Sequence, residues 1–241
     1  DLTDLRPPQA PFDLALPMTL TDADLSELNR WANARAGAIR GTLVSNIAHL
    51  SLNWPGEIRA DFPMNVFNAR TVRALSLPYT PSVELTAAEI RALPGEKELI
   101  VYGRLPLMTL RHCPLNARLG KGRHDACRRC DGAGPYLKDC VLTDRMGAVF
   151  PLERLKTSSG CIVRVRNSVP LMLLRRIAKL PAAARWRMIF TTEAEPMSLA
   201  LIRLYRAALD GADFRLDPAW AQVDAAASTT GHYFRGVDDD R

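Results

Sequence analysis

The sequence has no uninterrupted apolar run of about 18 residues, and its first residues show no basic-then-apolar secretory signal. The lack of a long apolar run argues against a membrane-spanning helix. The composition, 47% hydrophobic and 24% charged over 241 residues, also excludes a disordered chain, a collagen-like fibre and a coiled coil. We therefore expect one large globular domain or two small ones. Because the chain opens on Asp1 without an initiator Met, we also expect it to be part of a longer protein.

Signatures of several common enzyme classes are absent as well. No Gly-x-Gly-x-x-Gly follows a predicted strand, and the chain has no P-loop lysine, no Gly-x-Ser-x-Gly elbow and no His-Glu-x-x-His. Of the four histidines, His49 lies in an apolar stretch and is expected to be packed and hydrogen-bonded rather than catalytic. A Rossmann domain and a Ser/His/Asp hydrolase are therefore disfavoured, and no catalytic residue can be named.

The charge balance is basic: 32 Lys and Arg against 26 Asp and Glu give a net charge of +6. The cations comprise 27 Arg and only 5 Lys, and Arg is the better residue for gripping phosphates and carboxylates. RNA or another anionic substrate is thus one candidate partner. The charges do not gather into a polybasic block, however, so a solvated Arg-rich surface is the favoured interpretation.

Short apolar runs alternate with helical stretches along most of the chain. Before the cysteines, strands are predicted at 14–18, 39–46, 58–66, 79–85 and 98–103, with helices at 21–37, 69–75 and 87–93. After them, strands are predicted at 162–166 and 186–192, with helices at 170–180 and 196–209. This alternation is typical of right-handed βα units on a parallel sheet.

The fold class that follows is α/β: a partial or incomplete TIM-like βα-barrel with an irregular cysteine-rich insertion. The expected organisation has four parts. They are βα units at 1–110, a cysteine-rich metal or iron–sulfur lobe at 111–161, further βα units at 162–216 and a C-terminal tail at 217–241.

Polar residues follow several predicted strands, where a parallel barrel carries its functional groups. They are Asn46, Asn65, Asn68, Glu84 and Arg104. We expect Asn46, Asn68, Glu84 and Arg104 to bind substrate, with the last three pointing into one shared mouth. The alternative is that the asparagines cap the next helices and that Glu84 forms a surface salt bridge.

All five cysteines lie between 113 and 161. The odd count and a Cys-x-x-Cys pair, Cys127 and Cys130, favour a metal or iron–sulfur site in a reducing compartment, the cytoplasm, over a disulfide framework. A zinc ribbon would need a second Cys-x-x-Cys, which is absent. Cys113 and either Cys140 or Cys161 must complete four ligands, and such dispersed ligation suits a [4Fe–4S] cluster at least as well as zinc. Reduced thiols packed as small hydrophobes are the remaining alternative.

At these residues the chain resembles the collagenase-like peptidase family of unknown catalytic type, number thirty-two. The motifs that carry the resemblance follow one another in a specific order and extend over nearly the whole chain. They are MNVFN at 64–68, PSVEL at 81–85, ELIVYGRLPLM at 98–108, HCP at 112–114, LTDRMGAVFPL at 142–152, GC at 160–161, NSVPL at 167–171 and TGHYFRGV at 230–237.

The resemblance implies a βα-barrel with a cysteine-bearing insertion and one of two activities. The family name implies peptide hydrolysis, whereas members with a four-cysteine [4Fe–4S] cluster hydroxylate RNA bases or the ubiquinone ring without molecular oxygen. Carried over to this sequence, the resemblance implies that the cluster ligands are Cys113, Cys127, Cys130 and Cys161. Cys140 matches no cysteine of the family pattern and is at most a substitute ligand.

The chain departs from the resemblance in two respects. It has Arg-His-Cys-Pro at 111–114 instead of the His-Gly-Ala-x-Cys of the peptidase-named branch, and the family's N-terminal half is missing. We therefore expect an iron–sulfur enzyme of the hydroxylase type that combines with the missing half or with a partner subunit. A collagenase-like peptidase and a non-catalytic zinc-stabilised support domain are the alternatives, and the lack of a nucleophile–base pair weighs against the peptidase.

Overall fold

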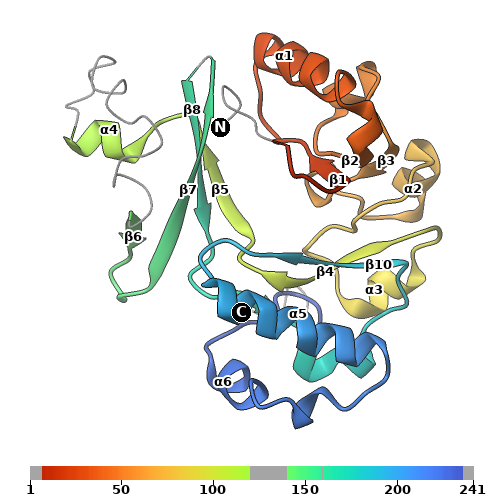
Figure 1. The fold of residues 1–241 in the computed structure, drawn as a ribbon, viewed down its shortest axis with the longest axis vertical. Coiled ribbons are helices and arrows are strands. Elements are labelled where there is room, and N and C mark those ends of the chain that lie inside the picture. The colour runs from red at the N-terminus through yellow and green to blue at the C-terminus, as the bar shows by residue number, and fades with distance from the viewer. Residues whose placement is uncertain (1–6, 120–139, 159, 236–241) are drawn as a thin grey trace. The chain divides into compact units, whose positions relative to one another are not determined.

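The computed structural model describes residues 7–119, 140–158 and 160–235 (Figure 1). The chain divides into two compact units, each built from two separate stretches. The first unit comprises residues 1–64 and 106–168, and the second comprises 65–105 and 169–241. Both helices and sheets are present, so the expected mixed α/β class is confirmed. The described residues form no closed barrel.

The first unit contains a parallel three-stranded sheet in the order β1-β2-β3. Its strands are β1 (Phe12–Ala15), β2 (Ile39–Val44) and β3 (Glu57–Ala60), and α1 (Asp22–Asn33) connects the first two. The helix begins where predicted, because the Thr21 side chain accepts a hydrogen bond from the Asp24 backbone N–H. Leu28 and Ala32 of α1 pack with Ile39 and Val44 in one apolar core. Short 3-10 helices, η1 (Ala36–Ala38), η2 (Ile47–Ser51) and η3 (Phe62–Met64), fill the connections.

The same unit contains an antiparallel sheet in the order β5-β8-β7-β6. Its strands are β5 (Pro106–Leu110), β6 (Val141–Thr143), β7 (Val149–Thr157) and β8 (Gly160–Arg166), with α4 (Pro114–Leu119) following β5. The expectation of an irregular lobe over 111–161 therefore differs from the structure, in which β6 and β7 lie there. The predicted strand 162–166 exists, but it pairs antiparallel with β5 and β7 and belongs to no βα unit.

The second unit is organised around β4 (Glu98–Gly103). It pairs in parallel with β10 (Arg185–Ile189) and in antiparallel with β9 (Leu171–Met172). Isolated parallel bridges join Val66 to Pro81 and Tyr79 to Lys97. The helices are α2 (Ala69–Leu75), α3 (Ala87–Ala92), η5 (Leu174–Lys179), α5 (Glu195–Leu209), η6 (Phe214–Leu216) and α6 (Trp220–Ala225).

Gly103 allows β4 and β10 to approach each other. Its φ is +128°, and a Cβ there would lie 2.2 Å from the Ile189 carbonyl oxygen. Only glycine adopts this conformation without strain and leaves room for the neighbouring strand. The end of β4 is therefore fixed by a residue whose role is steric.

Four predicted elements differ from the structure. The strand predicted at 58–66 ends at Ala60, the strand at 79–85 is reduced to bridges, and part of the tail forms α6. The predicted helix 170–180 is instead β9 followed by η5, since Leu171 and Met172 pair with β4. None of the described helices is long and apolar enough to cross a bilayer.

Candidate metal centre

The antiparallel sheet carries Cys161 on a defined face. In its β7–β8 ladder, Leu152 lies opposite Val165, Arg154 opposite Val163 and Lys156 opposite Cys161. Directly opposed residues share a face, and alternate residues of one strand do too. Cys161 therefore lies on the same face as Val163 and Val165, which are buried together with Leu152 in a small apolar cluster. We call this face the cysteine face.

Cys113 lies at the end of the sheet where Cys161 is found. Leu110, in β5, is opposite Val163 in β8, and the two strands run antiparallel. The chain beyond Leu110 therefore continues toward the part of β8 that contains Cys161. Cys113 also packs against the apolar cluster of the cysteine face. The ladder thus brings residues 48 positions apart in sequence to the same end of one face.

Cys140 contacts the same cluster from a different place. Its carbonyl accepts a hydrogen bond of 3.2 Å from the Leu152 N–H, so it lies beside that end of β7. Leu152 is four residues from Lys156, the neighbour of Cys161, which corresponds to about 13 Å along the strands. With two strand spacings added, about 10 Å, Cys140 and Cys161 are too far apart to bind one metal. At most one of them can share a site with Cys113: the β5–β8 register directs the chain toward Cys161, whereas Cys113 and Cys140 both pack against the apolar cluster.

The remaining predicted ligands, Cys127 and Cys130, lie outside the described residues. Within 7–119, 140–158 and 160–235, no three His, Cys, Asp or Glu side chains are close enough together to hold a metal ion. A centre on the cysteine face therefore requires the Cys-x-x-Cys pair in addition to Cys113 and Cys161.

Two cations lie on the cysteine face itself. Lys156 is directly opposite Cys161 in the ladder, and Arg154 is opposite Val163. Opposed side chains have Cβ atoms about 5 Å apart, so the Lys156 side chain lies beside that of Cys161. Sequence spacing alone did not reveal Lys156, because only the strand register places it opposite Cys161.

Two of the four predicted substrate-binding residues serve as helix caps. The Asn46 side-chain oxygen accepts from the Ala48 N–H at 3.0 Å, at the start of η2. The Asn68 side-chain oxygen accepts from the N–H groups of Arg70 and Thr71 at the start of α2. Their oxygens are thus already used by the backbone, which is the alternative that the sequence left open.

Asn68, Glu84 and Arg104 are not linked to one another. All three lie in the second unit, but no hydrogen bond or ion pair joins any two of them where the structure describes the chain. Glu84 is exposed. Nothing in the structure supports the predicted shared mouth.

Arg104 belongs instead to a polar group at the carboxyl ends of β4 and β10. Its Nε donates to Thr192 Oγ1 at 3.2 Å. The neighbouring Glu193 carboxylate accepts from the Tyr102 hydroxyl at 3.0 Å and from the N–H groups of Thr191 and Thr192. Burial and the Glu193 charge both raise the pKa of Tyr102. Glu193 was missed because the sequence there resembles the polar start of a helix.

His49 is packed and hydrogen-bonded, as predicted. It is 2% exposed, and its Nδ1 accepts from the Ser45 N–H at 3.1 Å. Burial lowers its pKa, so the neutral imidazole is favoured. A role in proton transfer to substrate has no support from this geometry.

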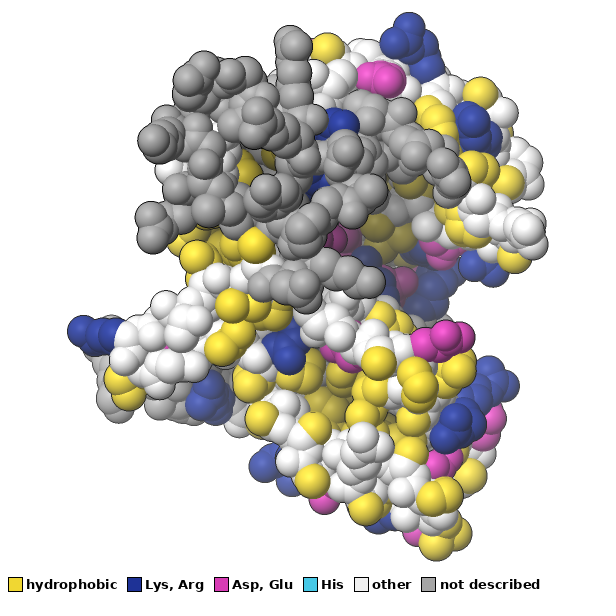
Figure 2. All heavy atoms as spheres, turned by 60° about the vertical axis from the view of Figure 1, so that its left-hand side comes forward, with side chains coloured by type: hydrophobic (Ala, Val, Ile, Leu, Met, Phe, Trp, Pro, Cys, Tyr) yellow, Lys and Arg dark blue, Asp and Glu magenta, His cyan; other side chains and the backbone are white. Residues whose placement is uncertain are grey.

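Charged side chains on the viewed surface are dispersed. In Figure 2, Lys and Arg are interspersed with apolar, acidic and neutral side chains rather than gathered into one continuous patch. This distribution agrees with the favoured interpretation of the Arg excess.

Comparisons of the chain with protein-family models, with curated proteins and with solved structures found no match. The resemblance to the collagenase-like family stays a prediction, and the functional argument depends on the cysteine face.

Proposed function

We propose that the chain is the later part of an iron–sulfur βα-barrel enzyme of the hydroxylase type. The observation that carries the proposal is the β5–β8 register, which directs the chain beyond Leu110 toward the part of β8 that contains Cys161. In the sequence, Cys127 and Cys130 fall between α4 and β6.

The donor set fits a [4Fe–4S] cluster. Thiolates are the ligands that such clusters take, and here Cys161 would come from β8, Cys113 from the connection between β5 and α4, and the other two from the Cys-x-x-Cys pair. Lys156, opposite Cys161, adds positive charge beside a net-negative group. When bound, the cluster supplies one-electron transfer; the chain's own residues hold it, limit its exposure to water and balance its charge. The proposed substrate is an RNA base or a small ring compound.

A zinc-stabilised support domain is the second candidate, and one observation favours it. Among the described residues, the apolar cluster of the cysteine face contains three buried residues, Leu152, Val163 and Val165. So small a core contributes little stability to a four-stranded sheet, and a structural metal commonly compensates for this in small domains. Zinc would then act on stability alone.

Anaerobic purification followed by iron, sulfide and zinc analysis separates the two candidates. We expect about four iron and four sulfide per chain, together with visible iron–sulfur absorbance. Cys113→Ser, Cys127→Ser, Cys130→Ser and Cys161→Ser should each abolish that absorbance. Cys140→Ser is the matched control and should retain it, because Cys140 lies beside Leu152, far from Cys161.

Two results would contradict the ligand assignment or the function. If Cys140→Ser loses the cluster and Cys161→Ser keeps it, the register argument is wrong. One zinc per chain without sulfide would support the second candidate.

The activity is tested separately. The cluster-loaded protein is incubated anaerobically with RNA, and mass spectrometry of the digested nucleosides is used to detect one added oxygen.

A further inference from the structure

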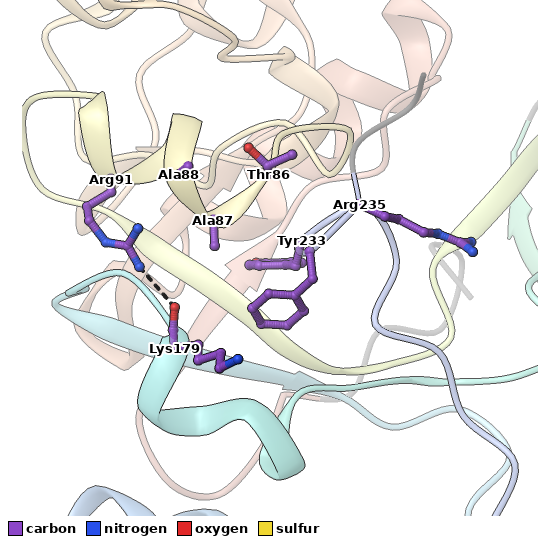
Figure 3. A pocket seen from close by; sticks show the side chains of 8 residues that line it. Thr86, Ala87, Ala88, Arg91, Lys179, Tyr233 and Arg235 are labelled. Carbon is purple, nitrogen blue, oxygen red and sulfur yellow. Dashed lines mark hydrogen bonds between the residues drawn. The ribbon is translucent and has the colours of Figure 1, made fainter. Parts of the chain in front are cut away.

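The second unit contains an open hollow that includes no cysteine. Its volume is about 550 Å³, and it is bounded by α3, the end of η5 and residues 233–235 (Figure 3). Ligand pockets for small molecules have volumes of about 300–1,000 Å³. The lining residues are Thr86, Ala87, Ala88, Arg91, Lys179, Tyr233, Phe234 and Arg235. We call it the α3 hollow.

The walls of the α3 hollow are fixed by hydrogen bonds. The Ala87 N–H donates to the Tyr233 carbonyl at 2.8 Å, which joins the start of α3 to the C-terminal segment. Tyr233 is 6% exposed, and its hydroxyl donates to the Ile100 carbonyl in β4. On the opposite wall, the Arg91 guanidinium donates to the Lys179 carbonyl at 3.0 Å, as Figure 3 shows. The concave shape is therefore built by contacts among three separate segments.

Cations gather at this hollow, while the neighbouring Glu89 carboxylate is taken up by hydrogen bonds from the Thr86 N–H and hydroxyl. Arg91 and Lys179 line it, and the Arg176 guanidinium lies 5.1 Å from the centre of the Phe234 ring. All three side chains belong to exposed residues. Where the structure describes the chain, no acidic residue lines the hollow and none of these three cations forms an ion pair.

Three other arginines of this unit, by contrast, are paired with carboxylates. Arg185 pairs with Glu96, Arg206 with Asp210 and Arg175 with Asp224. Repulsion among three cations around one concave surface is unfavourable unless an anion is present. Among the described residues no carboxylate is paired with these three cations, so their charge is available to an anion from outside the chain.

We propose that the α3 hollow binds a small phosphorylated molecule. Arg91 uses part of its fork on the Lys179 carbonyl and keeps further N–H donors for phosphate oxygens, and the Lys179 ammonium adds a second charge. The Phe234 ring and the Ala88 methyl group supply apolar surface for the carbon skeleton. Such a site is independent of the cysteine face, and its test is independent of the proposed iron–sulfur activity.

The test is a calorimetric titration of the full chain with inorganic pyrophosphate and with a nucleoside diphosphate, at low salt. Arg91→Gln/Lys179→Gln is compared with Arg70→Gln/Arg73→Gln, which removes the same charge from exposed α2 arginines without ion pairs. Each charge-assisted hydrogen bond corresponds to about a tenfold change in affinity. We expect the first variant to bind both probes at least tenfold more weakly, and the control to stay within about twofold of the parent.

Phe234→Leu distinguishes the contribution of the ligand's carbon skeleton to affinity from that of its phosphates. We expect it to weaken nucleoside diphosphate binding severalfold and to leave pyrophosphate binding unchanged. Thermal melting of every variant confirms that it is folded. The proposal is overturned if neither probe binds the folded parent, or if both double variants lose affinity equally. It is also overturned if single-stranded RNA alone binds and Arg91→Gln/Lys179→Gln weakens that binding, because the hollow would then be part of an RNA surface.

Discussion

The Tyr205 hydroxyl joins three segments of the second unit, so its removal is a sharp test of the packing there. The residue is 2% exposed on α5. Its hydroxyl donates to the Val101 carbonyl in β4 at 2.6 Å and accepts from the Leu173 N–H at 3.1 Å. Its ring also lies edge-on to Trp186, with centroids 6.4 Å apart. Tyr205→Phe removes the two hydrogen bonds and keeps the ring.

The size of the destabilisation depends on which hydrogen bonds the Leu173 N–H and the Val101 carbonyl keep in Tyr205→Phe. The Leu173 N–H also donates to the Val101 carbonyl at 3.1 Å, so neither group is left without a partner. The loss is therefore two buried hydrogen bonds at about 1 kcal/mol each, without the larger penalty of an orphaned group. We expect Tyr205→Phe to lower the free energy of unfolding by about 2 kcal/mol. Tyr233→Phe is the control and should lower it by about 1 kcal/mol, because only the bond to the Ile100 carbonyl is lost.

Urea unfolding followed by tryptophan fluorescence and circular dichroism measures both changes. Trp186 contacts the Tyr205 ring, so its emission reports on this unit directly. We expect the midpoint to fall with an unchanged slope, which means that stability alone has changed. The reasoning is refuted if Tyr205→Phe is no more destabilising than Tyr233→Phe.

Two further predictions concern single positions. Gly103→Ala should destabilise by at least about 3 kcal/mol in chemical denaturation, since its Cβ would meet the Ile189 oxygen, whereas Gly37→Ala, with nothing within 4 Å of the added carbon, should be nearly neutral. Stability should also fall as the pH drops below about 6.5, because burial lowers the pKa of folded His49 and the unfolded chain binds the proton first. His49→Gln should remove that part of the pH dependence in urea unfolding followed across pH, and an unchanged profile would contradict the assignment.

Elements with strong local signals were predictable. The helix 69–75 and the strand 98–103 coincide with α2 and β4, because an Asn68 cap and a compact apolar run mark them in sequence. The predicted helix 170–180 is wrong because distant residues decide the structure there. Leu171–Met172 pairs with β4, and the Met172 N–H donates to the Thr229 carbonyl. All of residues 171–174 are buried, which an amphipathic helix would not allow.

The candidate metal centre was predictable in composition and not in geometry. Sequence spacing alone predicts that Cys127 and Cys130 form one chelating pair, and it leaves Cys140 and Cys161 as alternatives. The distinction between them arises from the β6–β7–β8 register, a long-range property that no local pattern encodes. Asn68 shows a second reason why the site was hard to predict. A polar residue after a strand can equally well bind a substrate or cap the next helix, and Asn68 caps α2.

The antiparallel insertion has a consequence for the order of folding. Residues 104–184 separate β4 from β10, so pairing those strands in an unfolded chain requires closure of a long loop. The β7–β8 hairpin is local and forms on a much shorter timescale. Once β5 joins it, Pro106 lies opposite Arg166, and the two ends of the insertion are brought together. We expect the insertion to fold first. Its folding shortens the effective loop between β4 and β10, and so lowers the entropy cost of pairing these two strands.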